Sequence, residues 1–379
     1  MKKLILLIII FLCILIFIFQ EKKFEGDTIF IGSSLPETGT MKEYGKAVKD
    51  GANAYFNYVN QNNLLEDKKI EFITYDDKYE PRLTILNTKK LLENEKIFTL
   101  YGLVGTPTVK NILPIVNQTD IPLISTFSGA SFLRNCTNPH IVNFRNSYKD
   151  EIQSHIKYLY EKKGFTKIAV FYQNDEYGED GYVSVVKILK QYNLTPVGEG
   201  SYKRNTLSIR HAFNSIKDAN PEAIIMIGAN KANTLFIQKS KQNQNFQNTI
   251  FANISSGNAD QMVKNLGEDS KNVIFSQIVP SYQDVTIPVV QEYHDILKFY
   301  NDSFQPGFIS LEAYLSAKLV VTALKNVKGV LTRDKFVYQL KKLPSDTLDG
   351  ITIDSKKKDF FQKVYLFEYK NKTFTEIKI

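Results

Sequence analysis

The chain has 379 residues, 43% hydrophobic and 23% charged, a balance that fits a globular protein of two or three domains and excludes disordered, collagen-like and polytopic membrane chains. Its two cysteines, Cys13 and Cys136, cannot build a disulfide framework or a four-ligand zinc site, and we predict neither a metal nor a cofactor. The net charge of +8 falls to +5 without residues 1–23, which carry four lysines and one glutamate, and the lysines are spread along the chain, so nucleic acid is not an expected partner.

The first element is an apolar leader. Lys2 and Lys3 precede an unbroken apolar run over residues 4–19, which ends at polar residues 20–23. This run is intermediate in length between a signal-peptide core and a membrane span, and no small-x-small cleavage triplet follows it. We therefore predict export, with residues 1–23 as a signal peptide or an N-terminal membrane anchor. Lipid modification at Cys13 is a further alternative, which the bulky Leu12 before it disfavours.

From residue 28 onward, short apolar runs alternate with amphipathic stretches of helical length. In the first such stretch Val48, Ala52, Tyr55 and Val59 recur at helical spacing, whereas polar residues such as Asp50 are expected to face water. This rhythm predicts an α/β fold with two doubly wound parallel-sheet lobes. The predicted strands are residues 28–31, 70–75, 97–101 and 122–125 in one series and 167–172, 223–227, 249–252 and 273–278 in another.

The loops after two of these strands form the candidate binding site, because parallel sheets bind ligands beyond the carboxyl ends of their strands. In the first loop Gly105 precedes Thr106, an expected N-cap, so a helix would begin there and offer unpaired N–H groups to an anion such as a carboxylate. In the second loop Ser128 and Gly129 offer further donors beside an apolar wall, Phe127. An ordinary helix start or turn explains each loop as well, so the pattern leaves both interpretations open.

No catalytic constellation competes with binding. The four histidines stand apart in the sequence, and the H-E-x-x-H, G-x-S-x-G and G-x-x-x-x-G-K-[ST] motifs are absent from it. The histidines are expected at the surface or half-buried, and Asp76-Asp77 is expected to form a surface turn after a strand. We therefore predict that the protein is not an enzyme.

Several segments together carry a family resemblance. Ser33-Ser34-Leu35-Pro36-Glu37-Thr38-Gly39, followed by Tyr44-Gly45 and Tyr75-Asp76-Asp77, resembles type I periplasmic solute-binding proteins of the leucine/isoleucine/valine-binding family, the substrate-binding proteins of branched-chain amino acid ABC transporters. The resemblance runs over nearly the whole chain after the leader. Its other segments are residues 102–108, 122–124, 127–130, 144–148, 168–172, 177–178 and 308–314.

This resemblance implies a domain organisation and a function. Two lobes joined by a three-strand hinge, with crossovers near residues 146, 277 and 350, would close like a flytrap on a small solute. Lobe 1 would comprise residues 24–146 plus 278–349, and lobe 2 residues 147–277 plus 350–379. The implied protein is a periplasmic, monomeric receptor of an ABC importer that binds an amino acid or related small carboxylate and delivers it to an ABC permease in the inner membrane.

An alternative of a different class stays open. The same fold could serve as a membrane-anchored sensory module that signals ligand occupancy to a partner protein through the same closure. Residues 4–19, the only segment expected to contact the membrane, favour this alternative if they are retained as an anchor.

The resemblance also implies a ligand site. In the family's amino-acid site, hydroxyl and backbone groups of the two loops bind the carboxylate and an acidic residue of lobe 2 binds the ammonium. Here these positions fall on Gly105 beside Thr106, on Gly129 beside Ser128, and near Ser255, so the acid is missing and an ammonium would lack its counter-charge. Glu37 is the remaining candidate for that role. Lys231 would face the cleft or stay on the surface, and aromatic residues at family positions would line it. The candidate ligand-binding residues are Glu37, Tyr44, Gly105, Thr106, Phe127, Ser128, Gly129, Tyr148, Tyr177, Lys231 and Ser255.

Overall fold

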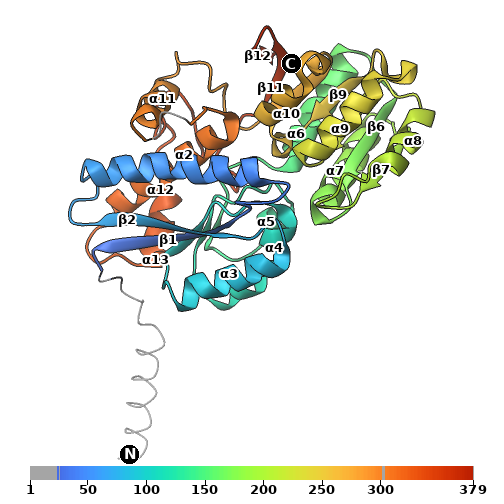
Figure 1. Ribbon diagram of the computed structural model, residues 1–379. Helices are drawn as coiled ribbons and strands as arrows, with labels where there is room; N and C mark the ends of the chain where they lie inside the picture. Colours follow the sequence, from blue (N-terminus) through green and yellow to red (C-terminus); the bar gives the residue numbers. More distant parts are fainter. Residues whose placement is uncertain (1–23, 25, 301–303, 379) are drawn as a thin grey trace, which may run out of the picture.

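The computed structural model describes residue 24, residues 26–300 and residues 304–378. Figure 1 shows two lobes, each a sheet flanked by helices. The predicted leader, and with it the expected signal peptide or membrane anchor, lies outside the described residues.

The first sheet is parallel and has the strand order β2-β1-β3-β4-β5. Helix α2 covers one face, where α12 packs along it, and α3 and α4 cover the other face (Figure 1). The strands are β1 (Thr28–Leu35), β2 (Lys69–Asp76), β3 (Thr99–Tyr101), β4 (Leu123–Ile124) and β5 (Ile141–Val142). The helices are α2 (Lys42–Gln61), α3 (Pro81–Glu93), α4 (Thr106–Gln118), α5 (Phe132–Asn135), α11 (Pro288–Tyr300), α12 (Phe308–Asn326) and α13 (Arg333–Leu340).

The second sheet has the order β12-β11-β10-β9-β8-β6-β7. Its strands are β6 (Ile168–Gln173), β7 (Glu199–Tyr202), β8 (Ala223–Ile227), β9 (Ile250–Asn253), β10 (Val273–Gln277), β11 (Tyr365–Lys370) and β12 (Thr373–Ile377). Its helices are α6 (Tyr148–Lys157), α7 (Glu176–Gln191), α8 (Arg210–Asp218), α9 (Asn230–Lys241) and α10 (Ala259–Leu266), with a π-helical turn at Tyr158–Lys162 and 3-10 turns at Gln244–Phe246, Ser255–Gly257 and Gly267–Ser270. Strands β6 to β10 are parallel, whereas β11 and β12 form an antiparallel hairpin on β10.

The predicted α/β fold with two sheet-based lobes is confirmed, with one difference in the second sheet. The antiparallel hairpin at residues 365–377 and the strands β5 and β7 were not predicted. Strand β5 has only two residues and β7 contains a glycine, so neither gives the apolar run on which a strand prediction depends.

Three polar residues that were expected at or near the surface are buried. Asp50 on α2 bonds Lys46 Nζ at 2.5 Å, and Asp77 accepts hydrogen bonds from Ser34 Oγ at 2.8 Å and from the Tyr79 amide at 2.9 Å. His155 on α6 pairs its Nε2 with a backbone carbonyl at 3.0 Å. Burial raises the pKa of Asp77 to about 6 and lowers the pKa of His155 to about 4. These expectations of exposure were wrong because hydrogen-bond partners within the fold compensate the burial.

Segments far apart in sequence meet between the two sheets. Asn143 pairs with Asp359 in a parallel bridge, the Phe361 amide donates to the Phe144 carbonyl at 2.8 Å, and the Phe144 and Phe360 rings stack with centroids 4.8 Å apart. Residues near the first predicted crossover therefore lie beside residues that follow the third. The lobe boundaries 24–146 plus 278–349 and 147–277 plus 350–379 stay a prediction.

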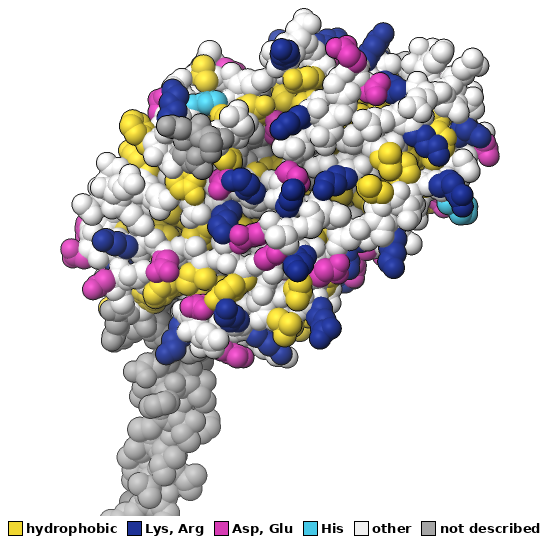
Figure 2. All heavy atoms as spheres, viewed as in Figure 1, with side chains coloured by type: hydrophobic (Ala, Val, Ile, Leu, Met, Phe, Trp, Pro, Cys, Tyr) yellow, Lys and Arg dark blue, Asp and Glu magenta, His cyan; other side chains and the backbone are white. Residues whose placement is uncertain are grey.

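Charges of both signs are mixed on the surface. On the face drawn in Figure 2, Lys and Arg side chains alternate with Asp and Glu side chains and form no continuous basic stripe. None of the helices in the described part of the chain is both long enough and apolar enough to cross a membrane.

Candidate functional site

A cavity lies between the two lobes at the carboxyl ends of the parallel strands. Its empty volume is about 300 Å³, within which the centre of a water molecule can occupy only about 20 Å³, enough for about one water. The lobes are therefore closed, and a ligand would enter when they part. The lining residues are Met41, Tyr44, Tyr79, Val104, Gly105, Phe127, Tyr148, Gln173, Tyr177, Ala229 and Ser256.

Five of the predicted site residues meet in this lining: Tyr44, Gly105, Phe127, Tyr148 and Tyr177. The Tyr44 and Phe127 rings contact edge to face with centroids 5.9 Å apart, and the Tyr148 and Tyr177 rings lie 5.2 Å apart. The first pair comes from the lobe with α2 and the second from helices α6 and α7, so each lobe contributes an aromatic pair. The tyrosine hydroxyls give this mainly apolar wall its polar groups.

Three other predicted residues lie behind the lining. The Thr106 hydroxyl is 2.8 Å from Ser128 Oγ and 3.0 Å from the Tyr148 hydroxyl, and the Gly129 carbonyl accepts from the Tyr148 amide at 2.9 Å. The expectation that Thr106 caps α4 is wrong, because Gly105 holds the cap position and no side chain caps the helix. These hydroxyls instead tie the two loops to the start of α6.

Gly105 allows an aromatic ring to occupy the first loop. Its φ of +98° is a conformation that favours glycine, and a Cβ atom there would lie 2.2 Å from Cε2 of Tyr79. The Tyr79 hydroxyl in turn accepts from Gln173 Nε2 at 3.2 Å, a contact between the two lobes. Sequence reasoning missed Tyr79 and Gln173. The one signal in the sequence was Gly105 itself, a glycine where the family has a hydroxyl residue. Its missing side chain leaves the space that the Tyr79 ring fills.

A buried arginine, Arg145, stands behind Tyr44 and Phe127. Its Nη1 donates to the Tyr44 hydroxyl at 3.4 Å, its guanidinium carbon is 5.9 Å from the Phe127 ring centre, and its Nε is 3.5 Å from Oε1 of Glu312. Burial raises the pKa of Glu312 to about 7, an effect that the charge of Arg145 opposes. Burial also opposes the charge of Arg145, yet the nearby acidic groups, Glu312 first, hold its pKa above the usual value. Arg145 was within a segment that carries the family resemblance but was not predicted as a site residue.

The predicted residue Ser255 belongs to this buried network and not to the lining. Its hydroxyl contacts Nη2 of Arg145 and lies 2.9 Å from Oε1 of Glu151, while its amide donates to Oε2 of Glu151 at 2.7 Å. Ser276 Oγ also donates to Glu151 at 2.6 Å. The acid that the family places in lobe 2 is thus absent from position 255, and the nearby Glu151 already accepts three hydrogen bonds.

Glu37 and Lys231 lie outside the lining. Glu37 accepts from Lys49 Nζ at 2.8 Å and from Thr74 Oγ1 at 2.7 Å, so its carboxylate already has a cationic partner. Lys231 is a partly exposed residue in the first turn of α9. For both residues a ligand contact stays a prediction.

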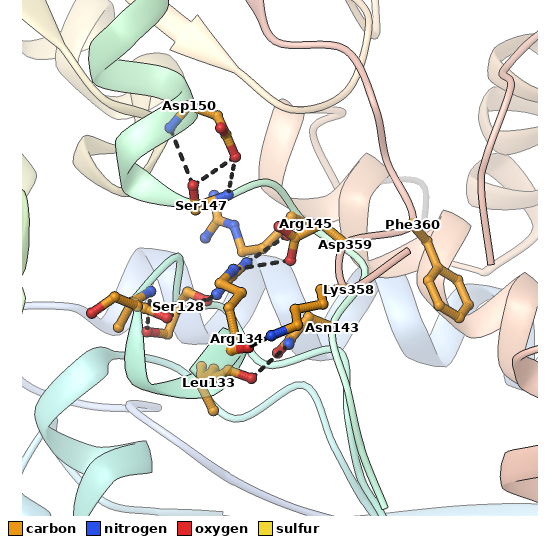
Figure 3. Close-up of polar contacts among 12 residues, drawn as sticks. Ser128, Leu133, Arg134, Asn143, Arg145, Ser147, Asp150, Lys358, Asp359 and Phe360 are labelled. Atoms are coloured by element: carbon orange, nitrogen blue, oxygen red, sulfur yellow. Dashed lines mark hydrogen bonds and ion pairs between the residues drawn. The ribbon is translucent and has the colours of Figure 1, made fainter. Parts of the chain in front are cut away.

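Arg134 positions the second loop from behind. Figure 3 shows its guanidinium pointing toward the Ser128 loop and toward Asp359. It donates to the carbonyls of Ser128 and Ala130 at 3.1 Å and of Arg145 at 2.6 Å, and its Nε is 2.9 Å from Asp359 Oδ1. Arg134, on the short helix α5, therefore links the Ser128 loop, the first predicted crossover and the C-terminal segment.

Polar contacts at the rim also join the lobes. Arg204 lies 3.3 Å from Glu80 and 3.5 Å from Asp175. Asn205 donates to Glu80 at 2.6 Å and contacts the Thr40 hydroxyl at 2.6 Å. The rim is therefore held by exposed or half-exposed groups that can separate at modest cost.

The lining of the cavity carries few groups for acid–base or metal chemistry. No lining residue is acidic, basic or a histidine. Among residues 24, 26–300 and 304–378, no three His, Cys, Asp or Glu side chains gather as a metal site would require. Two buried hydroxyls of the lining, on Tyr177 and Ser256, have no hydrogen-bond partner.

Comparison with known proteins agrees with this arrangement. A family model described as "Periplasmic binding protein" matches residues 28–373. The chain belongs to the periplasmic binding protein family. The predicted type I class, with its leucine/isoleucine/valine-binding members, is confirmed by relatives such as the "Leu/Ile/Val-binding protein homolog 7" of Brucella abortus (strain 2308), which is 21% identical over 79% of this chain and 78% of its own length.

Solved structures of family members have the same fold. A possible leucine/isoleucine/valine-binding protein from Rhodopirellula baltica SH 1 superposes with a TM-score of 0.88 at 28% identity, over 93% of this chain and 96% of its own. A fatty acid ABC transporter substrate-binding protein from Thermomonospora curvata reaches a TM-score of 0.84 at 15% identity, over 94% and 93% of the two chains.

Proposed function

We propose that this family member is the extracytoplasmic receptor of an ABC importer and works in the periplasm. In this proposal it binds an amino acid or related small carboxylate between its lobes and passes the solute to an inner-membrane permease. The observation that carries the proposal is the cavity between the lobes, which draws its lining from the strand ends of both sheets. A solute held there contacts both lobes at once, so binding favours the closed form over the open one.

The choice of solute class rests on the relatives and on the polar groups of the site. One relative is named as a leucine/isoleucine/valine-binding homologue and one structural neighbour as a fatty acid substrate-binding protein, and ligands of both kinds carry a carboxylate. Helix α4 begins beside the cavity, and the positive end of a helix dipole favours an anion. We infer binding without catalysis, since the lining offers no acid–base pair.

The direct test is to find a retained solute. We expect native mass spectrometry of the purified full chain to show a small-molecule adduct that is lost on denaturation, and calorimetry with the identified solute to show one site per chain. A chain that carries no adduct and binds no amino acid or carboxylate in a screen would contradict the proposal.

The sensory alternative differs in the partner and not in the site. It is favoured by the apolar run of residues 4–19, which lies outside the described residues. Loss of solute uptake on deletion of the gene supports the importer. Unchanged uptake together with a lost transcriptional response to the solute supports the sensor.

A further inference from the structure

Two hydroxyl groups of the cavity need partners that the protein does not supply. Tyr177 is 4% exposed and Ser256 is 9% exposed, both line the cavity, and neither hydroxyl has a hydrogen-bond partner. Buried polar groups are nearly always paired, because leaving them unpaired costs stability. The two hydroxyls therefore point to a bound molecule that forms hydrogen bonds with this side of the cavity, as a donor or as an acceptor.

The lining itself supplies no carboxylate for a positively charged group of a ligand. None of the described lining residues is acidic, and three acids near the lining have partners within the protein. Asp175 accepts from Gln173 Nε2 at 2.7 Å and lies 3.5 Å from Arg204, and Glu312 lies 3.5 Å from Arg145. Glu151 accepts its three hydrogen bonds from Ser255 and Ser276. A buried ammonium would therefore meet no carboxylate in the lining itself, an unfavourable arrangement.

The rest of the environment offers an apolar surface and the start of a helix. Arg145 contacts Tyr44 and lies against the Phe127 ring, but Glu312 at 3.5 Å offsets its charge. The thirteen-residue helix α4 presents its N-terminal end at Gly105. The rings of Tyr44, Phe127 and Tyr148 and the side chains of Met41 and Val104 supply an apolar surface for the remainder of the ligand.

We propose that the site binds an organic carboxylate that has an apolar or aromatic body and no ammonium group, an inference that rests on the proposed receptor function. The lobes must part further to admit this ligand, because the cavity as it stands has room for about one water. The carboxylate then accepts hydrogen bonds from the Tyr177 and Ser256 hydroxyls, and the rings enclose the body. The site thereby discriminates against α-amino acids, although family members are named for binding them.

Matched pairs of ligands test the discrimination. 4-Methylpentanoate is leucine without its ammonium group, and 3-phenylpropanoate is phenylalanine without it. By calorimetry on the full chain, we expect at least one of these acids to bind at least about tenfold tighter than its amino acid. The amine 3-methylbutan-1-amine, which keeps the ammonium and lacks the carboxylate, should not bind.

A pair of tyrosine variants tests the proposed contact. Tyr177→Phe removes the unpaired hydroxyl and should weaken binding of the preferred acid about ten- to a hundredfold. Its melting temperature should not fall, because the hydroxyl has no partner within the protein. Tyr192→Phe is the control, since the Tyr192 hydroxyl lies at the surface of the same lobe, 3.2 Å from Glu161, and its loss should leave the affinity unchanged.

The outcomes separate this inference from the receptor function. If neither acid binds at least about tenfold tighter than its amino acid, or if the amine binds, the inference is overturned and the receptor function is left standing. An unchanged affinity of Tyr177→Phe would overturn it as well. Failure of all five compounds to bind would also overturn it, and the receptor function would fail with it only if native mass spectrometry found no retained solute.

Discussion

Replacing Gly105 with alanine probes the contact between the first loop and Tyr79. The substitution forces a side chain into a backbone with φ +98°, which costs about 1 to 3 kcal/mol. Its Cβ would lie 2.2 Å from Tyr79 Cε2, so the ring must move and its 3.2 Å hydrogen bond with Gln173 is lost, a further 0.5 to 1.5 kcal/mol or so. We expect Gly105→Ala to lower the free energy of unfolding by about 2 to 4 kcal/mol.

Gly164→Ala is a control for a positive-φ glycine with open space around it. Gly105, with φ +98° and ψ +146°, lies in a region occupied almost only by glycine, so its backbone cost is the higher of the two. Gly164 has φ +71°, and a Cβ atom there would meet no other heavy atom within 4 Å, so alanine should cost only about 1 to 2 kcal/mol. Urea unfolding of both variants measures the difference, which we expect to be at least about 1 kcal/mol. In a Tyr79→Ala background this difference should become smaller, because the clash with the ring is gone while the higher backbone cost at Gly105 remains. Equal losses from the two glycine variants in the natural background would refute the reasoning.

Four further predictions concern the hydroxyl network, pH, the rim and the leader. Thr106→Val should lower stability by about 1 to 3 kcal/mol, because it leaves the Tyr148 hydroxyl without its partner; an equal loss from Thr119→Val at the exposed end of α4, measured by calorimetry, would contradict this. Burial raises the Glu312 pKa from 4.5 to about 7, so the folded chain binds this proton more tightly and loses stability as pH rises from about 4.5 to 7. Between pH 5 and pH 8 the melting temperature of Glu312→Gln should fall less than that of the natural chain. Equal falls in the two proteins would argue against a role of the Glu312 proton. Arg204→Ala should weaken solute affinity up to about fivefold, because the contact of Arg204 with Glu80 of the other lobe is lost. Unchanged affinity would mean that this contact does not hold the lobes closed. The chain without residues 1–23 should be monomeric and should stay unbound in a vesicle flotation assay, and its flotation with the vesicles would count against the leader as the sole membrane contact.

The sequence predicts the architecture well because most strands of the two sheets are short apolar runs that can be recognised from neighbouring residues alone. The runs at residues 28–31, 70–75 and 223–227 lie within strands of parallel sheets, and the four apolar positions of α2 are buried. Strands that lack an apolar run were missed. The antiparallel direction of the hairpin β11–β12 was also missed. Strand direction depends on pairing with the distant β10 and not on the local pattern of residues.

The site was predicted only in part, for a related reason. Residues such as Tyr44 and Tyr177 stand in segments that carry the family resemblance, and they line the cavity. Tyr79 and Gln173 were not recognised from the sequence, because their role is a hydrogen bond with each other between the two lobes, which only the folded structure shows. Hydroxyl groups look alike in a sequence, so the pattern could not separate Thr106, which pairs within the protein, from Ser256, which does not.

Helix α12 comes late in the chain but packs on elements made early, and this affects how the protein folds during synthesis. The Tyr101 hydroxyl donates to the carbonyl of Ala313, 212 positions later, at 2.6 Å, and α12 packs along α2. A nascent chain that has not yet been extended through residue 326 therefore leaves uncovered the apolar surface of α2 and of the first sheet on which α12 packs. Such a surface is prone to aggregation while synthesis continues. The first lobe to start is thus completed late, and a late stop codon that removes α12 would expose that surface.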